Sequence, residues 1–311
     1  MKYATKCIRN TLKGLALLSF SLSVIFFTVQ PSSARDLPPI GKKKIIYGNP
    51  GAGSALIFMT TASILLEKIG YEVDAKKLGT GLIYQGLATG DVDLMSTAFL
   101  PGQHPHVNKH EDKLDFIGTS YAPVPSGLVA PAYVPFNSIA DLKKPEVQKS
   151  LKGIIHSGGP GWGVSIRANE TIKAYGLDFK VVNSSGAAMN AAFKKAYAKK
   201  KPVLITGWCP HFLCKLYDVK FLSDSKGIWG YSQDYHVARL GFRKDFPRAT
   251  VLISRLTLDV SFMNQALAWM ESEKIDAPTA AKRILEQNPE LVWYWAGDLG
   301  GGIKKPDSLK K

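Results

Sequence analysis

The sequence has few cysteines, a shortage of acidic residues and no apolar run long enough to cross a bilayer. Three cysteines among 311 residues exclude a fold held together by a dense disulfide framework. The sequence has only 25 acidic residues against 40 Lys and Arg, so its net charge is +15. The longest apolar run, residues 14–29, is shorter than the roughly 20 residues of a membrane-spanning helix. Hydrophobic and charged shares of 45% and 21% are ordinary for a globular protein and exclude a disordered or collagen-like chain.

The first 34 residues have the pattern of a secretory signal peptide. Basic residues without any acid precede the apolar run, and small side chains follow it at Ser32 and Ala34. Cleavage after Ala34 would leave 277 residues (311 less 34) and a net charge of +11 (15 less 4). Cys7 lies before the apolar run, so no lipid anchor is expected. We expect a signal peptide at 1–34 and a periplasmic mature protein.

Two cysteines remain in that mature chain, Cys209 and Cys214. Five positions apart on a helix, their side chains would point away from each other, and their Cα atoms would be too far apart for a bridge. The prediction is that both are buried apolar side chains without a disulfide. The lysines are dispersed and no aromatic residues interleave them, which indicates a solvated surface and no nucleic-acid partner.

From residue 42 onward, short apolar runs alternate with segments of helical periodicity, several of which end at glycine. This alternation predicts an α/β fold with a mostly parallel sheet. The expected strands are residues 44–48, 71–77, 92–99, 153–156, 181–182, 202–206 and 235–241, and the expected helices are 55–69, 82–89, 164–175, 187–200, 252–273 and 279–286.

A proline-rich extended stretch, residues 121–135, separates a first αβ block from a second. The strand expected at 235–241 returns to the first block, so the second block reads as an insertion. We therefore expect two lobes joined by two crossing segments, with a ligand cleft between them. Lobe 1 is assigned to residues 41–134 plus 236–311, and lobe 2 to residues 135–235.

Motifs for catalysis are weak. The glycine-rich loop at residues 48–54 resembles a P-loop but lacks the lysine that contacts phosphates, so it predicts at most an anion contact. His104, His106 and His110 fall close together, and a metal-dependent periplasmic enzyme using them is the alternative of a different class. The intervening proline and lysine disfavour a shared helical face, and no Cys or Asp joins them. We expect no metal, no cofactor and no catalytic residue.

Three aromatic residues stand where expected strands end, each bordered by glycine or proline. Phe99 closes one strand, Trp208 follows another, and Trp162 directly precedes a helix. Strand ends and helix starts form the edge at which an αβ cleft opens. The alternatives, left open here, are that these side chains line a ligand site or that they cap the core.

Three segments carry a family resemblance: residues 82–104, 159–177 and 201–221. They contain YQGLATGDVD, PGWG and KPV followed by GWCPH, and in these motifs the chain resembles the substrate-binding proteins of glycine betaine/proline-type ABC transporters. The similarity extends from about residue 44 to residue 295. It implies a two-lobed periplasmic-binding-protein fold of type II, an aromatic cage for a quaternary ammonium group, and no enzymatic activity.

The resemblance also assigns roles to residues. Trp162 and Trp208 match cage tryptophans, while Phe99 stands where the family usually has a third. His104 falls near a family histidine that binds the ligand carboxylate, within one residue. The backbone amides of Gly163 and Val164 match positions that bind this carboxylate in part of the family. His211 matches the histidine of the GWxPH motif, and its role is open.

Physical chemistry agrees with these roles. A trimethylammonium group has no N–H to donate, so aromatic faces select it through their quadrupoles. The ligand carboxylate needs hydrogen-bond donors, and the dipole of the helix that begins with the amides of Gly163 and Val164 favours an anion. The expected function is the capture of glycine betaine or a related quaternary ammonium compatible solute by a monomeric receptor. The expected partners are the permease and ATPase subunits of an ABC transporter, and the alternative ligands are choline, carnitine and other methylated ammonium compounds.

Overall fold

The computed structural model describes residues 36–51 and 53–310. The expected signal peptide, residues 1–34, lies outside the described residues. No helix in the described ranges is long and apolar enough to cross a membrane.

One nine-stranded sheet contains all the strands of the described chain, and it is mixed. Its path is β2-β1-β3-β9-β4-β7-β5-β6, with β8 paired to β4. The strands are β1 Lys44–Asn49, β2 Glu72–Lys77, β3 Leu94–Leu100, β4 Leu114–Pro131, β5 Ile154–Ser157, β6 Lys180–Asn183, β7 Ile205–Trp208, β8 Val219–Phe221 and β9 Tyr231–Arg239. The prediction of a mostly parallel sheet is wrong at the centre. There β9 runs antiparallel to β3 and β4, and β4 runs antiparallel to β7 and β8.

Helices follow most strands and pack on the sheet. The α-helices are α1 Gly53–Lys68, α2 Thr80–Thr89, α3 His104–His110, α4 Pro145–Leu151, α5 Gly163–Tyr175, α6 Gly186–Ala198, α7 Leu213–Leu216, α8 Phe242–Asp245, α9 Pro247–Arg255, α10 Val260–Ser272, α11 Ala277–Gln287 and α12 Pro289–Ala296. The single helix expected over residues 252–273 is wrong, because α9 ends at Arg255 and Asp259 caps a new helix by accepting a hydrogen bond from the Ser261 amide.

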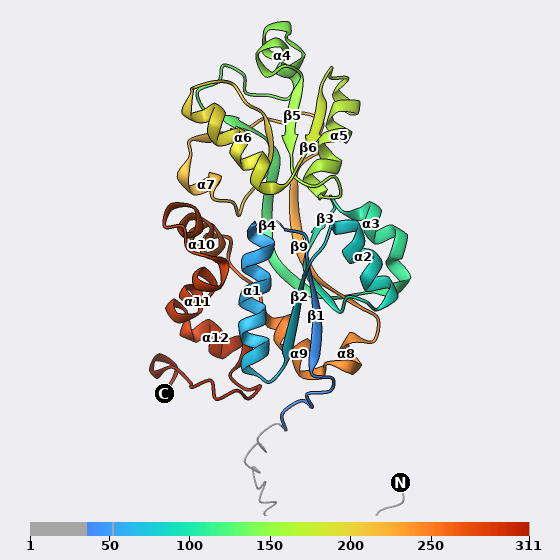
Figure 1. Cartoon of the computed structure of the whole chain (residues 1–311), viewed down its shortest axis with the longest axis vertical. Helices are drawn as coiled ribbons and strands as arrows, with labels where there is room; N and C mark the ends of the chain where they lie inside the picture. The colour runs from blue at the N-terminus through green and yellow to red at the C-terminus, as the bar shows by residue number, and fades with distance from the viewer. Residues whose placement is uncertain (1–35, 52, 311) are drawn as a thin grey trace, which may run out of the picture. The chain divides into compact units, whose positions relative to one another are not determined.

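The long strand β4 belongs to two groups of strands. Up to Pro125 it pairs with β9, and from Ser126 onward it pairs with β7 and then β8. Figure 1 shows β4 and β9 side by side as they run between the elements around α1 and the elements around α6. The chain returns through β9 to pair with β3, as the sequence predicts for the strand near residue 235.

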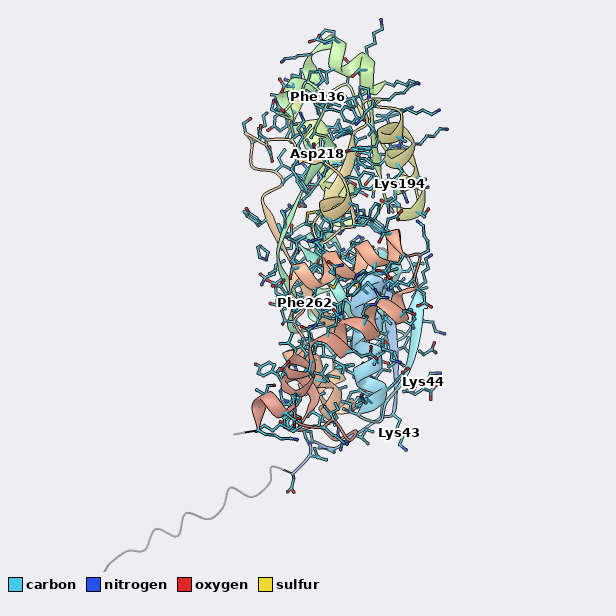
Figure 2. The ribbon with its side chains drawn as sticks, turned by 90° about the vertical axis from the view of Figure 1, so that its left-hand side faces the viewer. Lys43, Lys44, Phe136, Lys194, Asp218 and Phe262 are labelled. Atoms are coloured by element: carbon cyan, nitrogen blue, oxygen red, sulfur yellow. A yellow bond between two sulfur atoms is a disulfide. The ribbon has the colours of Figure 1, made fainter. Side chains whose placement is uncertain are left out.

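The core continues through both groups of elements. Buried apolar side chains of α1, such as Phe58 and Leu65, belong to the same cluster as Ile155 and Phe193 of the second group. Phe136 and Lys194 of the second group, and Lys44 and Phe262 of the first, mark the two groups in Figure 2. This arrangement places the ends of β3 and β7 and the starts of β9, α1 and α5 around one region.

Candidate functional site

A pocket lies where these strand ends and helix starts meet. Both groups of elements contribute to it: eight lining residues come from β3, β4, β9, the start of α1 and the loops after β1 and before α3, and four from β7 and the start of α5. The lining residues are Pro50, Ser54, Ala55, Thr97, Phe99, Gln103, Tyr121, Trp162, Gly163, Val164, Trp208 and Asp234.

The two tryptophans form a corner of this pocket. The ring centroids of Trp162 and Trp208 are 5.7 Å apart, with an angle of 83° between the planes. Trp208 is 7% exposed, and its indole Nε1 donates to the Ser54 hydroxyl at 3.4 Å, across from the start of α1. One perpendicular pair therefore offers two aromatic faces to a single ligand group.

Phe99 and Tyr121 supply further aromatic surface. Both are buried and line the pocket. In the sheet, Phe99 of β3 pairs with Asp234 of β9, and Asp234 pairs with Tyr121 of β4, so the two rings flank Asp234. Trp229, by contrast, is buried outside the pocket lining. Four aromatic side chains from two groups of elements thus surround one small space.

Glycine at position 163 is required by close packing. A Cβ atom there would lie 2.4 Å from Cδ1 of Phe99 and 3.1 Å from the carbonyl carbon of Gly102. Such distances are below van der Waals contact, so a side chain at 163 would displace the Phe99 ring or the facing backbone. At Gly163, therefore, the backbone of the second group lies directly against Phe99 and Gly102 of the first.

Helix starts bring partial positive charge to the same space. Helix α5 begins at Gly163, so the amides of Gly163 and Val164 have no carbonyl one turn earlier in the helix. Ser54 and Ala55 at the start of α1 also line the pocket. The positive ends of two helix dipoles thus favour an anionic group nearby.

Asp234 is a buried carboxylate in this lining, 2% exposed. Burial raises its pKa to about 7, and a hydrogen bond with the Tyr121 hydroxyl opposes the rise. Burial, and to a smaller extent the charge of Asp234, raises the pKa of Tyr121 far above its usual value, so the phenol keeps its proton. The pocket therefore contains an acid that titrates near neutral pH.

The structure brings five of the seven predicted site residues to the pocket: Phe99, Trp162, Gly163, Val164 and Trp208. His104 is exposed at the start of α3 and lines a different depression beside Pro123. Its predicted carboxylate contact stays a prediction without support from this geometry.

His211 lies behind the pocket wall. Its ring packs on Trp208 at 5.1 Å and on Phe212 at 4.5 Å, and its amide donates to Asn264 Oδ1 at 2.9 Å. Burial lowers the pKa of His211 to about 4, so the ring is neutral at physiological pH. The geometry fits a support for Trp208.

The sequence analysis did not assign Gln103, Tyr121 or Asp234 to the site, although all three line the pocket. One feature of the sequence could have indicated Asp234. It lies in the strand-forming segment YSQDYHV, and a charged residue is rare on the buried face of a strand.

The three clustered histidines lie on α3 and its start. His106 hydrogen-bonds through Nε2 to the Gly161 carbonyl at 3.2 Å and stacks on Tyr84. Within the described ranges, no three His, Cys, Asp or Glu side chains gather as a metal site would require. His106 thus connects α3 to the loop that carries Trp162.

The two cysteines correct a prediction. Cys209 and Cys214 form a disulfide with Cα atoms 6.2 Å apart. The prediction of free side chains assumed one helix over these residues, but α7 begins only at Leu213. The preceding turn brings the two side chains together directly after Trp208.

Comparisons with known proteins agree with this fold. Residues 43–287 match the family described as the substrate-binding domain of the ABC-type glycine betaine transport system. The glycine betaine/carnitine transport binding protein GbuC of Listeria monocytogenes is 29% identical over 177 residues, which cover 56% of this chain and 56% of that protein. The chain therefore aligns with little more than half of this curated relative.

Two solved structures are similar over most of their length. The glycine betaine/L-proline-binding protein ProX of Borrelia burgdorferi has a TM-score of 0.77 and 25% identity, with 81% of this chain and 96% of that chain covered. Lactococcal OpuAC, in its closed form with glycine betaine, has a TM-score of 0.76 and 27% identity, with 82% and 99% covered. These likenesses confirm the predicted two-lobed, type II α/β fold.

Proposed function

The chain belongs to the family of substrate-binding domains of ABC-type glycine betaine transport systems, and from this premise we propose that it is an exported receptor for a quaternary ammonium solute. It captures glycine betaine or a related compound and delivers it to a membrane permease. Choline, carnitine and proline betaine are the alternative ligands. The names of GbuC, ProX and the OpuAC complex support this ligand class.

The observation that carries the proposal is the aromatic corner of Trp162 and Trp208, facing Phe99 and Tyr121. Each desolvated face contributes roughly 0.5–2 kcal/mol to binding of a permanent cation. A methylated ammonium cannot donate a hydrogen bond, so such faces, rather than polar side chains, hold it. We assign the cage to these four residues, with His211 as a support behind Trp208.

We assign a ligand carboxylate, where present, to the start of α5. The free amides of Gly163 and Val164 begin α5, where the helix dipole favours an anion. His104 lies outside the lining of this pocket, so the proposed carboxylate contact does not include it.

Closure of two lobes is the proposed mechanical step. The lobe boundaries predicted at 134/135 and 235/236 lie farther along the chain than the changes in strand pairing at Pro125 and near Tyr231. We place the hinge at these pairing changes. Contacts across the cleft, such as the Lys194–Glu271 ion pair at 2.7 Å, would hold the closed form.

The proposal includes no catalysed reaction, and ATP is consumed by the transporter's ATPase subunits. The receptor acts as a monomer in the periplasm after removal of its signal peptide. The rival, a metal-dependent enzyme built on His104, His106 and His110, predicts stoichiometric zinc in the purified protein. Elemental analysis separates the two, since bound zinc would favour the enzyme.

Calorimetry of residues 35–311 tests the function directly. The titrants are glycine betaine, choline, carnitine and proline betaine, with L-alanine as a solute without methylated nitrogen. We expect saturable binding of at least one methylated ammonium compound and none of L-alanine. Absence of binding by all four would overturn the proposed function.

A further inference from the structure

The pocket contains one acidic side chain and no basic one. Among the lining residues, Asp234 is the single carboxylate, and no Lys, Arg or His lines the pocket in the described chain. Asp234 Oδ1 is buried and has no hydrogen-bond partner among the described residues. A buried carboxylate with an unused oxygen, aimed at a ligand pocket, lacks a partner that a ligand can supply.

Among residues 36–51 and 53–310, no cation compensates this charge. The titratable groups that face Asp234 are Tyr121 on β4 and Tyr84 on α2, and burial first and then the charge of Asp234 raise the pKa of both phenols. His236, two positions along β9, is neutral because burial lowers its pKa to about 4, and its ring is engaged by Ser96 and by the Leu256 carbonyl. The described surroundings thus give Asp234 a hydrogen bond from Tyr121 but no positive charge, and they leave Oδ1 without a partner.

The carboxylate lies within the aromatic site. The pairing of Phe99 with Asp234 and of Asp234 with Tyr121 puts the three residues side by side on adjacent strands. Any ammonium group held by these rings is therefore next to the Asp234 carboxylate. Desolvation strengthens the attraction between the two charges.

We propose that Asp234 is the counter-charge for the ligand's ammonium group and makes the site prefer choline-type cations over zwitterions such as glycine betaine. This inference rests on the proposed function and specifies its ligand. A choline-type ligand has a hydroxyl that can donate to Asp234 Oδ1. The carboxylate of a zwitterion gains no such bond and is repelled by the ionised aspartate.

The helix starts do not reverse this preference. The starts of α1 and α5 each carry about half of a unit positive charge. The free amides of α5 can donate hydrogen bonds to a ligand anion. Asp234, when ionised, carries a full unit charge inside the same pocket. Because Asp234 is directly beside Phe99 and Tyr121 in the sheet, an ammonium group in the cage is attracted by Asp234 more strongly than either helix start repels it. A zwitterion adds the repulsion between its own carboxylate and Asp234.

The test is calorimetric titration of residues 35–311 at pH 8 with choline chloride and with glycine betaine, in the unmodified protein and in Asp234→Asn. We expect tighter binding of choline in the unmodified protein. Asp234→Asn should weaken choline about tenfold or more, as the loss of a charged partner does, while glycine betaine changes less than about threefold or binds more tightly.

Asp115→Asn is the matched control, since it also removes one negative charge. Asp115 lies on β4, is paired with Arg243 at 2.8 Å, and is absent from the pocket lining. Both affinities should be unchanged in this variant. A loss of choline binding in Asp115→Asn equal to that in Asp234→Asn would overturn the local counter-charge.

A pH series on the unmodified protein gives a second readout that does not depend on folding of a variant. Choline should bind the ionised carboxylate, so its affinity should fall by up to about tenfold per pH unit below pH 7. Glycine betaine should show no such fall.

The outcomes separate this inference from the function it refines. If glycine betaine binds more tightly than choline at pH 8, or if Asp234→Asn leaves choline within about threefold, the inference is overturned and the receptor function stands. If neither compound nor any other methylated ammonium binds, both are overturned.

Discussion

Gly163→Ala tests whether the close approach of the two lobes matters for binding. The added Cβ would lie 2.4 Å from Cδ1 of Phe99 and 3.1 Å from the carbonyl carbon of Gly102. Carbon atoms pack at about 3.5–4.0 Å, so the ring must move by about 1 Å or the lobes must stay farther apart. Overpacking of this kind costs about 1–3 kcal/mol.

With the proposed closure, the cost applies to the closed form, for which we take the contacts of Gly163 with Phe99 and Gly102. Because the open form relieves the clash, most of that energy should appear as lost ligand affinity, about 5- to 150-fold. Calorimetry with the tightest quaternary ammonium ligand measures this loss, and thermal unfolding without ligand should change little.

Gly79→Ala is the control for the glycine substitution itself. Gly79 has a φ of −64°, and nothing lies within 4 Å of a Cβ built there. Ligand affinity should be unchanged in this variant. Affinity in Gly163→Ala equal to that of the unmodified protein would refute the role of the close approach.

Four further predictions concern the cage, the buried titrating groups and closure. Trp162→Ala and Trp208→Ala should each weaken binding by about 1.5–3 kcal/mol, or 10- to 100-fold; unchanged affinity in folded variants would contradict the cage. Phe99→Trp should weaken binding by about 1–3 kcal/mol, because the ring already lies against Gly102 and Gly163; tighter binding would show an undersized face instead. The free energy of unfolding should fall as pH drops from about 6.5 toward 4, because the unfolded state protonates His211 and His236, whose pKa values are about 4 when folded. Asp234, whose pKa is about 7 when folded, makes the free energy of unfolding rise as pH drops, so Asp234→Asn should steepen the fall. Urea denaturation across this range measures the effect, and a free energy of unfolding that does not change with pH would contradict it. Small-angle scattering should show a smaller radius of gyration with saturating ligand, and an identical radius would argue against closure.

Local sequence patterns predict much of the fold. Glycines after the helices, as at Gly90 and Gly176, mark ends that the structure confirms in the left-handed conformation. The strand that precedes α1 and the helix that begins after Trp162 are confirmed within a residue or two. These features depend on neighbouring residues alone.

Features that depend on distant residues could not be read in the same way. The orientation of β4 and β9 is set by pairing over more than 100 positions, as between Tyr121 and Asp234, and the alternation of strands and helices carries no such information. The disulfide was missed because a helix was assumed across the turn before Leu213. Asp234 faces the pocket through the same long-range pairing.

The aromatic residues were predictable because each lies at a strand end or a helix start, where a cleft opens. Phe99, Trp162 and Trp208 do line one pocket. His104, which rested on family resemblance, is the exception: α3 starts at His104 and leaves it exposed, whereas the preceding Gln103 is buried in the lining.

We infer that this pocket recognises a methylated ammonium by its charge, through aromatic faces. Calorimetric titration of residues 35–311 with choline and with 3,3-dimethylbutan-1-ol, which has the same shape and no charge, tests this inference. Choline should bind at least about tenfold more tightly, since several desolvated faces act on the cation alone. Equal affinity of the two compounds, or no binding of choline, glycine betaine or any other methylated ammonium compound, would contradict it.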